Sequence, residues 1–301
     1  MDSVQLIEST DALRGIVDEL QDHKYLGVDT EFDGFYSYFE KTCLIQVSTP
    51  ERDIIIDPLA IDDLSPLRQV LETPRTQKIM HASNNDLLAL QRDYGFRVHN
   101  LFDTAIAWQL LGHKRCGLAH VLQKELDVKH QKKSRYQRCD WAKRPLQPAQ
   151  IEYARLDTHY LISLRHRFDL QLSLDGLRSK ADQKFSDLEK LTFEPKKPDP
   201  SAYLKIKGAQ ELDSRGRRTL KALYRFRERL AQRQDRSPFR VITNQCLLHL
   251  ARNKPQTHQD LTCVHGLPRR FKGHQADVLL AVIHRANQRW LERYQQCNVS
   301  N

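Results

Sequence analysis

The chain has 301 residues, of which 40% are hydrophobic, and a formal net charge of +10 at neutral pH. This length can bury one substantial core and one smaller core, so we expect two domains. No apolar run is long enough to cross a bilayer, and the first residues lack a signal-peptide pattern; we therefore expect no membrane partner and a cytoplasmic location. Six cysteines lack the spacing of a zinc site and are expected to be free thiols.

Strand-like and helix-like segments alternate through the first 170 residues. After a strand-like start at residues 4–7, short stretches rich in Ile, Val, Leu and aromatic residues predict strands at 25–32, 43–49, 53–57, 77–82 and 98–102. Cap-type residues or a first-turn proline predict helices that begin at Ser9, Ser65, Ser83, Thr104 and Pro148. Gly95 is expected to end one of them. The strands between residues 25 and 57 have no helix between them, which predicts antiparallel pairing within a mixed α/β sheet.

A proline-rich segment separates this part from a helical one. Residues 194–201 contain three prolines and almost no apolar side chains, as in a linker. We therefore expect a first domain at 1–193, a linker at 194–204 and a second domain at 205–295. A long basic helix is predicted at about 213–236, and shorter helices near 243–252, 257–263 and 269–293.

The positive charge is confined to the last third of the chain. Residues 201–301 contain 20 Lys and Arg against 7 Asp and Glu, whereas residues 1–200 contain 28 against 31. This division suggests chemistry in the first domain and polyanion binding in the second; a general contribution to solubility is the alternative. Cations at helical spacing form a predicted stripe on the long helix: Arg218, Lys221, Arg225, Arg229, Arg233 and Arg236. A second cluster comprises Lys129, Lys132, Lys133, Arg135 and Arg138, and is expected to form a mobile loop beside the site described next.

Four acidic residues occur in three separate segments. Asp29 and Glu31 end a buried-type strand on one face of it, because strand side chains alternate. Asp86 is expected in the first turn of a helix, and Tyr153 and Asp157 lie one helical turn apart. Taken singly, each has an ordinary interpretation as a strand edge, a helix-dipole partner or a surface side chain.

Together these acids predict a metal site. Four convergent carboxylates suit two Mg²⁺ or Mn²⁺ ions, which take oxygen ligands. Such a pair can stabilise both the attacking and the leaving oxygen of a phosphoryl displacement. The Tyr153 hydroxyl could hydrogen-bond the attacking water. His81, at the end of the strand before Asp86, is better interpreted as a hydrogen-bonded histidine than as a site residue.

The order of these residues resembles the DEDD exonuclease superfamily in its tyrosine-bearing subclass, and the ribonuclease D family within it. The segments that carry the wider resemblance in the first domain are 43–48, 56–58, 101–104 and 140–146, the last reading Asp-Trp-Ala-Lys-Arg-Pro-Leu. Beyond the linker, the segments that resemble a helicase-and-RNase-D C-terminal (HRDC) domain are 206–208, 220–233, 236–241 and 247–251. Some ribonucleases D carry two HRDC repeats, and this chain has room for one.

The resemblance implies a ribonuclease H-like mixed sheet flanked by helices, followed by a small all-α HRDC domain. It implies a 3′→5′ exoribonuclease that hydrolyses single-stranded RNA 3′ ends to nucleoside 5′-monophosphates, as in 3′ maturation of tRNA precursors or other structured RNA. We expect a monomer, although the sequence itself carries no signal of oligomeric state. Asp29, Glu31, Asp86 and Asp157 would be the metal ligands and Tyr153 would orient the water. The residues expected to contact RNA are Phe32, Phe35, Tyr36, Lys221, Arg225 and Arg229. For the three aromatic residues, which follow a strand, the alternative is a place in the core.

Two other functions fit the same residues. A DNA exonuclease of the Werner type shares these acids, and the sequence does not show whether a ribose 2′-hydroxyl is recognised. A catalytically silent RNA-binding scaffold is the second alternative. Such a scaffold usually lacks a metal ligand, whereas all four acids and the tyrosine are present here.

Overall fold

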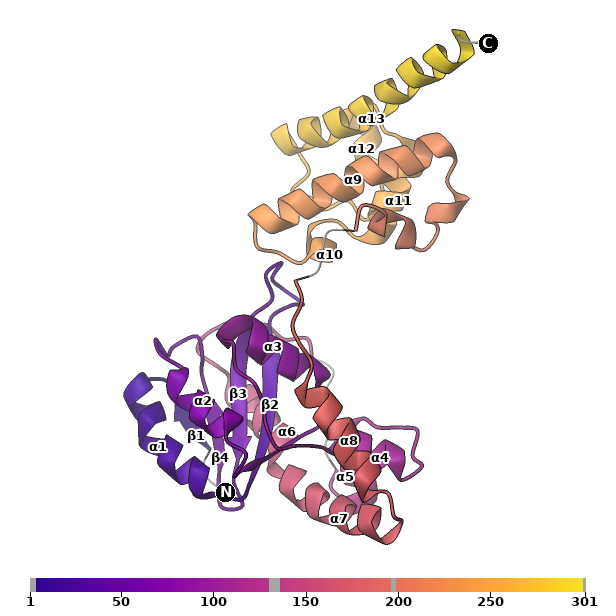
Figure 1. Ribbon diagram of the computed structural model, residues 1–301. Coiled ribbons are helices and arrows are strands. Elements are labelled where there is room, and N and C mark those ends of the chain that lie inside the picture. Colours follow the sequence, from indigo (N-terminus) through magenta and orange to yellow (C-terminus); the bar gives the residue numbers. More distant parts are fainter. Residues whose placement is uncertain (1–3, 130–135, 196–198, 300–301) are drawn as a thin grey trace. The chain divides into compact units, whose positions relative to one another are not determined.

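The computed structural model describes residues 4–129, 136–195 and 199–299, which divide into two compact units (Figure 1). The first unit comprises residues 1–35 and 40–195, and the second comprises residues 36–39 and 196–301. The middle of the predicted linker, 196–198, lies outside the described residues. So do Lys132, Lys133 and Arg135 of the second basic cluster.

The first unit is built on a six-stranded mixed sheet in the order β1-β4-β3-β2-β5-β6. The strands are β1 Gln5–Ile7, β2 Tyr25–Phe32, β3 Thr42–Ser48, β4 Asp53–Ile56, β5 Gln77–Met80 and β6 Leu101–Asp103. The predicted antiparallel pairing of β2 with β3 and of β3 with β4 is confirmed. The pairs β1–β4, β2–β5 and β5–β6 are parallel. The predicted mixed α/β sheet flanked by helices is therefore correct.

The helices of this unit begin largely where the sequence predicts. They are α1 Thr10–Asp22, α2 Ser65–Glu72, α3 Asn84–Tyr94, α4 Thr104–Leu110, α5 Leu118–Leu126, α6 Pro148–His159, α7 Leu161–Leu174 and α8 Arg178–Glu189. The Ser9 side chain caps α1 by accepting from the amide of Ala12. Gly95 ends α3 in the left-handed region, with a φ of 67°, as its predicted role requires. No prediction was made for α5, α7 or α8.

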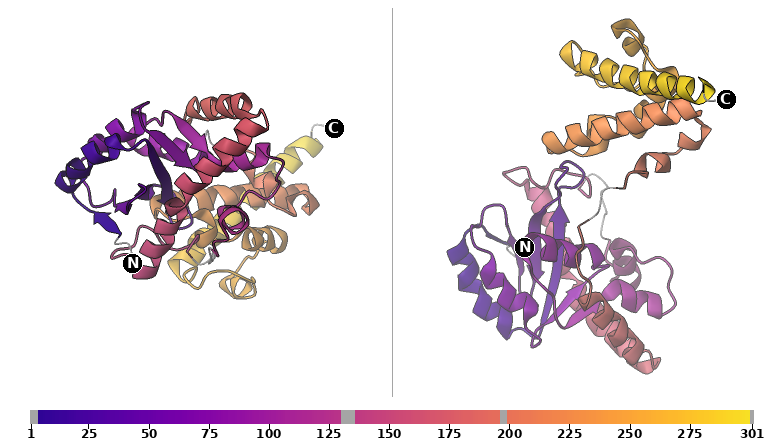
Figure 2. Two further views of the ribbon diagram at one scale, coloured as in Figure 1. Left: turned by 90° about the horizontal axis from the view of Figure 1, so that it is seen from below. Right: turned by 45° about the horizontal axis from the view of Figure 1, so that its top comes forward.

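Helices cover both faces of the sheet (Figure 2, left). Residues of β3 contribute to two apolar clusters: Ile45 and Val47 pack with α1, α2 and α3, whereas Cys43 and Leu44 pack with α6. The backbone of α6 lies very close to β2. A methyl group added at Gly27 would stand 2.7 Å from the Thr158 carbonyl oxygen, so only glycine permits this approach.

The second unit is all-helical around one apolar core. Its elements are two 3₁₀ turns, Ala202–Lys205 and Ala209–Glu211, and the helices α9 Ser214–Arg233, α10 Pro238–Val241, α11 Asn244–Asn253, α12 His258–Thr262 and α13 His274–Val299. The core side of α9 is Leu220, Leu223, Phe226 and Leu230, as the basic stripe implied. The predicted helix at 269–293 begins later, because residues up to Gly273, whose φ is 52°, form turns.

Residues 36–39 belong to this second unit although they lie between β2 and β3 in the sequence. The Asp235 carboxylate accepts from the amides of Tyr38 and Phe39, at 3.0 and 2.9 Å. The Ser237 amide donates to the Tyr36 carbonyl oxygen at 2.8 Å. These bonds satisfy backbone amide and carbonyl groups that would otherwise have to hydrogen-bond water.

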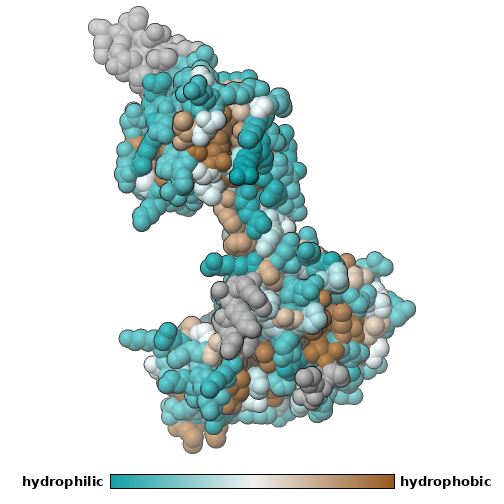
Figure 3. All heavy atoms as spheres, turned by 180° about the vertical axis from the view of Figure 1, so that it is seen from behind, coloured by the Kyte–Doolittle hydropathy of each residue, from teal (hydrophilic) through white to brown (hydrophobic). Residues whose placement is uncertain are grey.

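Hydrophilic side chains cover most of the face seen from behind, with apolar residues gathered in patches on each unit (Figure 3). Among the described residues, no helix is both long enough and apolar enough to cross a membrane.

Candidate active site

The structure brings four of the five residues predicted to be catalytic to the wall of one pocket in the first unit. The pocket has a volume of about 250 Å³. Its lining residues are Asp29, Thr30, Glu31, His81, Leu118, Gln137, Tyr153 and Asp157. Asp86 is 7% exposed and does not line it, but its charge acts directly on Asp29. Three elements therefore supply the predicted set: β2, the first turn of α3, and α6.

Asp29 and Glu31 lie near the end of β2, and the residues just before them in this strand are buried. They pair with Gln46 and Leu44 of β3, and the register shifts between Glu31 and Phe32. Such an irregularity ends regular pairing directly after the two acids. Both side chains are partly exposed at the point where the strand leaves the sheet.

Asp86 is placed by a turn that Asp103 holds. The Asp103 carboxylate accepts from the amides of Ala82 and Ser83 and from the Ser83 hydroxyl, at 2.8 to 3.2 Å. It also caps α4 by accepting from two amides of that helix. Ala82 has a φ of 57°, an uncommon conformation for a residue with a side chain. The turn therefore starts α3 at a fixed place, and the Thr30 hydroxyl then donates to the Asp86 carboxylate.

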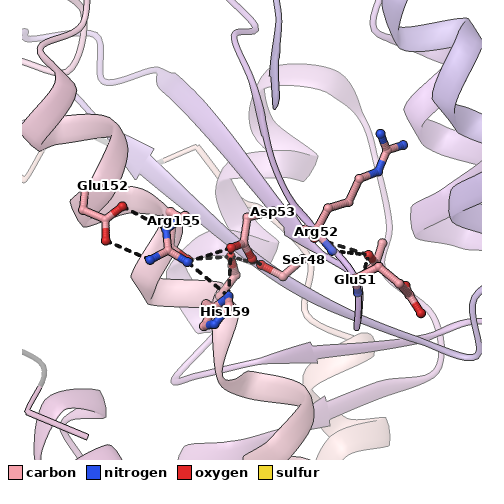
Figure 4. A network of polar contacts seen from close by, with 9 residues as sticks. Ser48, Glu51, Arg52, Asp53, Glu152, Arg155 and His159 are labelled. Carbon is pink, nitrogen blue, oxygen red and sulfur yellow. Dashed lines mark hydrogen bonds and ion pairs between the residues drawn. The ribbon is translucent and has the colours of Figure 1, made fainter. Parts of the chain in front are cut away.

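A buried polar network fixes α6 against β3 and β4 (Figure 4). The Asp53 carboxylate accepts from the Ser48 hydroxyl at 2.6 Å and from Arg155 at 2.9 Å, and it lies 2.8 Å from Nδ1 of His159. Arg155 is also held by two bonds to Glu152. Because Asp53 is only 3% exposed, these partners offset its desolvation. The network lies on one side of α6. Tyr153 and Asp157 project from another side of the same helix and line the pocket.

Arg144 fixes the segment that precedes α6. Its guanidinium forms two bonds to the buried carboxylate of Asp57, at 2.5 and 2.7 Å, and a third to the Cys43 carbonyl oxygen at 2.9 Å. A fourth bond reaches the Trp141 carbonyl oxygen at 2.6 Å. Trp141 is 1% exposed, and its ring centroid lies 6.1 Å from that of Tyr153. This clamp thereby supports the Tyr153 ring from behind.

Two carboxyl groups of the site, those of Asp29 and Asp86, have raised pKa values. Burial raises the pKa of Asp29 well above its usual range, and the charges of Asp86, Asp157 and Glu31 raise it further. Burial likewise raises the pKa of Asp86 to about 7, although the hydrogen bond from Thr30 opposes that shift. Ionisation of these carboxyl groups is therefore unfavourable unless a cation compensates their charge.

Tyr153 is a neutral phenol over the working pH range. Burial raises its pKa above the usual range, and the charges of Asp157, Glu31 and Asp29 raise it further. Its hydroxyl also hydrogen-bonds Asp157, which favours the protonated phenol. Tyr153 can therefore orient a water molecule through its oxygen but cannot serve as a base.

The chemistry of the donors fits divalent cations. All four acids offer oxygen ligands, and their mutual repulsion is what bound Mg²⁺ or Mn²⁺ would relieve. As the side chains stand, no group of three or more His, Cys, Asp or Glu among the described residues is arranged to hold a metal ion. Two of these carboxylates already accept hydrogen bonds, Asp86 from Thr30 and Asp157 from Tyr153.

His81 lines the pocket, and both its ring nitrogens have partners: Nδ1 lies 2.8 Å from the Thr104 hydroxyl oxygen, and Nε2 lies 2.6 Å from the Cys116 carbonyl oxygen. The hydrogen bonds predicted for it are present. Sequence reasoning missed Leu118 and Gln137 as pocket residues, because Leu118 begins α5, a helix that was not predicted, and Gln137 lies in a connecting segment without a motif of its own. It also gave no role to Thr30 or Asp103. The position of Thr30 between Asp29 and Glu31 was the available signal.

The residues expected to contact RNA are distributed over both units, and none lines the pocket. In the first unit, Phe32 is partly buried and Phe35 is 38% exposed. In the second, the Tyr36 ring lies under the Arg240 guanidinium, 4.0 Å from it. Lys221 is partly buried beside the Tyr203 ring, and Arg225 and Arg229 are exposed on α9.

Family models match both units. A 3′-5′ exonuclease model matches residues 4–173, and an HRDC domain model matches residues 217–283. The chain is similar to the exosome complex component 10 homolog of Caenorhabditis elegans, with 35% identity over 92% of this chain and 32% of that protein. The exosome complex exonuclease RRP6 of Saccharomyces cerevisiae is 32% identical over 84% of this chain and 37% of its own length. The chain thus spans about a third of the length of these curated relatives.

Solved structures with the same two parts are also similar. The catalytic core of RRP6 from Trypanosoma brucei superposes with a TM-score of 0.84 and 28% identity, over 95% of this chain and 80% of that one. Escherichia coli RNase D, described as an exoribonuclease involved in structured RNA processing, gives a TM-score of 0.72 and 28% identity, over 94% of this chain and 75% of that one.

Proposed function

Because the chain belongs to the 3′-5′ exonuclease family and resembles ribonuclease D in carrying an HRDC domain, we propose that it is a 3′→5′ exoribonuclease. It would hydrolyse single-stranded RNA 3′ ends and release nucleoside 5′-monophosphates, in the 3′ maturation of tRNA or other structured RNA. The observation that carries this proposal is the convergence of Asp29, Glu31 and Asp157 with Tyr153 at one pocket, with Asp86 behind it.

Divalent cations are part of the proposal, since the family is metal-dependent and the donors fit them. Asp29, Glu31 and Asp157 would hold one cation, and Asp29 with Asp86 would hold a second. When bound, these cations supply positive charge to the attacking and leaving oxygens of an in-line displacement at phosphorus. Mg²⁺ and Mn²⁺ both suit such ligands.

The chain's own residues position the reactants. Tyr153 keeps its proton, so its oxygen can accept from the attacking water and hold it near the scissile phosphate. The Asp53 network and the Arg144 clamp keep Tyr153 and Asp157 in place on α6. The exposed cations of α9 would hold the RNA backbone, since Arg225 and Arg229 face solvent.

The direct test is a cleavage assay with a 5′-labelled RNA that carries a single-stranded 3′ overhang. With Mn²⁺ we expect a ladder of shortening labelled products and no reaction with EDTA, and chromatography of the same reaction should detect the unlabelled nucleoside 5′-monophosphates. A DNA oligomer of the same sequence should be degraded more slowly. Faster degradation of the DNA would instead assign the chain to the DNA exonucleases, and RNA binding without cleavage would make it a silent scaffold.

A further inference from the structure

A pocket of about 520 Å³ lies in the second unit, between the end of α9 and the beginning of α13. The two helices run beside one another there (Figure 2, right). The pocket is lined by Phe226, Leu230, Arg233, Gln234, Phe271, His274, Gln275 and Val278. Its volume is in the range of pockets that take a ligand of moderate size. We refer to these eight residues as the α9–α13 groove.

The floor of the groove is apolar, but it offers no ring face for stacking. Phe226 and Phe271 are 8% and 4% exposed, and their planes are tilted by 60° at a centroid distance of 6.4 Å. Leu230 is 9% exposed, whereas Val278 on the wall of the groove is 37% exposed. A nucleobase binds such sites by lying on an exposed aromatic face. This floor instead suits the insertion of an aliphatic or aromatic side chain.

The rim of the groove is positive. Arg233 and His274 are exposed, and no carboxylate in the described parts of the chain pairs with either. The acids nearest to Arg233 in sequence are engaged elsewhere, because Glu228 pairs with Arg227 and Asp235 accepts from backbone amides. An occupant with negative charge around an apolar anchor would therefore complement both the rim and the floor.

We propose that the α9–α13 groove binds an acidic peptide segment of a partner protein through one or two large apolar side chains. The anchors occupy the space above Phe226, Leu230 and Phe271, and Asp or Glu residues of the peptide pair with Arg233 and with His274 when it is protonated. This inference does not rest on the nuclease site, since none of the groove residues lines the pocket that holds the acids. Arg233 is shared with the basic stripe, so the test below includes an RNA competitor.

A random dodecapeptide phage library panned against the immobilised full chain tests the proposal. We expect the enriched peptides to contain Leu, Phe or Trp flanked by Asp and Glu. A fluorescein-labelled synthetic copy of the strongest binder should bind the chain in solution. Its affinity should fall at least tenfold in Val278→Glu, which places a repelling charge on the exposed wall, and also in Arg233→Glu, which reverses the rim.

The matched control is Leu174→Glu, the same kind of change at an apolar helix residue in the first unit that is 77% exposed. It should leave peptide binding unchanged, and circular dichroism should show that all three variants are folded. Arg233→Glu, at an exposed position, carries the test if Val278→Glu does not fold.

Three results would overturn the proposal. The first is that no acidic-apolar sequence is enriched, and the second is that the peptide binds both groove variants as well as the unaltered chain. The third is that a labelled uridine 12-mer displaces the peptide and itself loses tenfold in affinity with Val278→Glu, since the groove would then belong to RNA.

Discussion

At the scale of single residues, the hydroxyl of Tyr153 is the most informative group to remove. Tyr153→Phe keeps the ring beside Trp141 and deletes only the oxygen that is proposed to orient the water. Turnover should fall by about 10², while the Kd for RNA stays within about twofold. Single-turnover cleavage and equilibrium binding, measured on the same RNA, separate the two effects. A weaker Kd with unchanged turnover would make Tyr153 a substrate-packing residue instead.

Asp86 should make the metal-free protein sensitive to pH. Its folded pKa of about 7 lies above the ordinary value of 3.8, so the folded state binds more protons between these pH values than the unfolded state does. Stability should therefore fall as pH rises from about 4 to about 7, by an amount on the order of 1 to 4 kcal/mol. The burial and repulsion that raise the Asp29 pKa act in the same direction.

Asp86→Asn removes the Asp86 contribution to this dependence and leaves the contribution of Asp29. In EDTA at pH 8, thermal melts should show a higher Tm for the variant than for the unaltered chain. Adding Mn²⁺ should raise the Tm of the unaltered chain and have less effect on the variant. An equal response of both proteins to Mn²⁺ would contradict the assignment of Asp86 as a metal ligand.

At the scale of elements, the position of α6 depends on Gly27. A methyl group there would overlap the Thr158 carbonyl oxygen and push α6 away from β2. Gly27→Ala should cost about 1 to 3 kcal/mol and lower activity, since α6 carries Tyr153 and Asp157. Gly15→Ala is the matched control, because nothing lies within 4 Å of its added methyl group on α1. It should leave activity unchanged and stabilise the chain by about 0.5 to 1 kcal/mol. If urea unfolding gave equal stabilities for both variants, the close approach would not matter.

Elements with a local signal could be predicted from the sequence, and those without one could not. β2 is marked by a short run of apolar and aromatic residues, and the cap at Ser9 by a side chain that bonds its own helix. In α7, by contrast, apolar residues occur on all sides, and Leu170 and Leu174 are exposed, so no amphipathic stripe marks it. The turn that places Asp86 depends on Asp103, 20 residues beyond Ser83, and no local pattern reveals that contact.

At the scale of the whole molecule, the charge of the last third should govern RNA binding. The double variant Arg225→Glu, Arg229→Glu should weaken binding to a long single strand. It should also make the dependence of log K on log salt shallower by roughly 0.7 per lost phosphate contact. The control is Lys180→Glu, Lys184→Glu, the same change of charge at exposed positions of α8. Titrations over a salt series measure the affinity and the slope for each double variant. If the α9 and α8 double variants had equal slopes, the basic stripe would not contact the RNA backbone.

The membership of residues 36–39 in the second unit is a property that the sequence did not reveal. Composition indicates a change near residue 195, but residues 36–39 join the second unit through Asp235 and Ser237, about 200 positions away. A contact between segments so far apart leaves no local pattern. The elements that place the four acids could be predicted for the opposite reason, because each acid lies on a strand or helix with a local signal.

The central claim is that RNA is hydrolysed at the site of the four carboxylates. The measurement that tests it most directly is single-turnover cleavage of a 5′-labelled RNA in Mn²⁺ by Asp157→Asn, with RNA binding measured in parallel. The substitution removes one charge and little volume, so RNA binding should persist while the rate falls by about 10³ or more. Near-normal cleavage by the folded variant would contradict the claim.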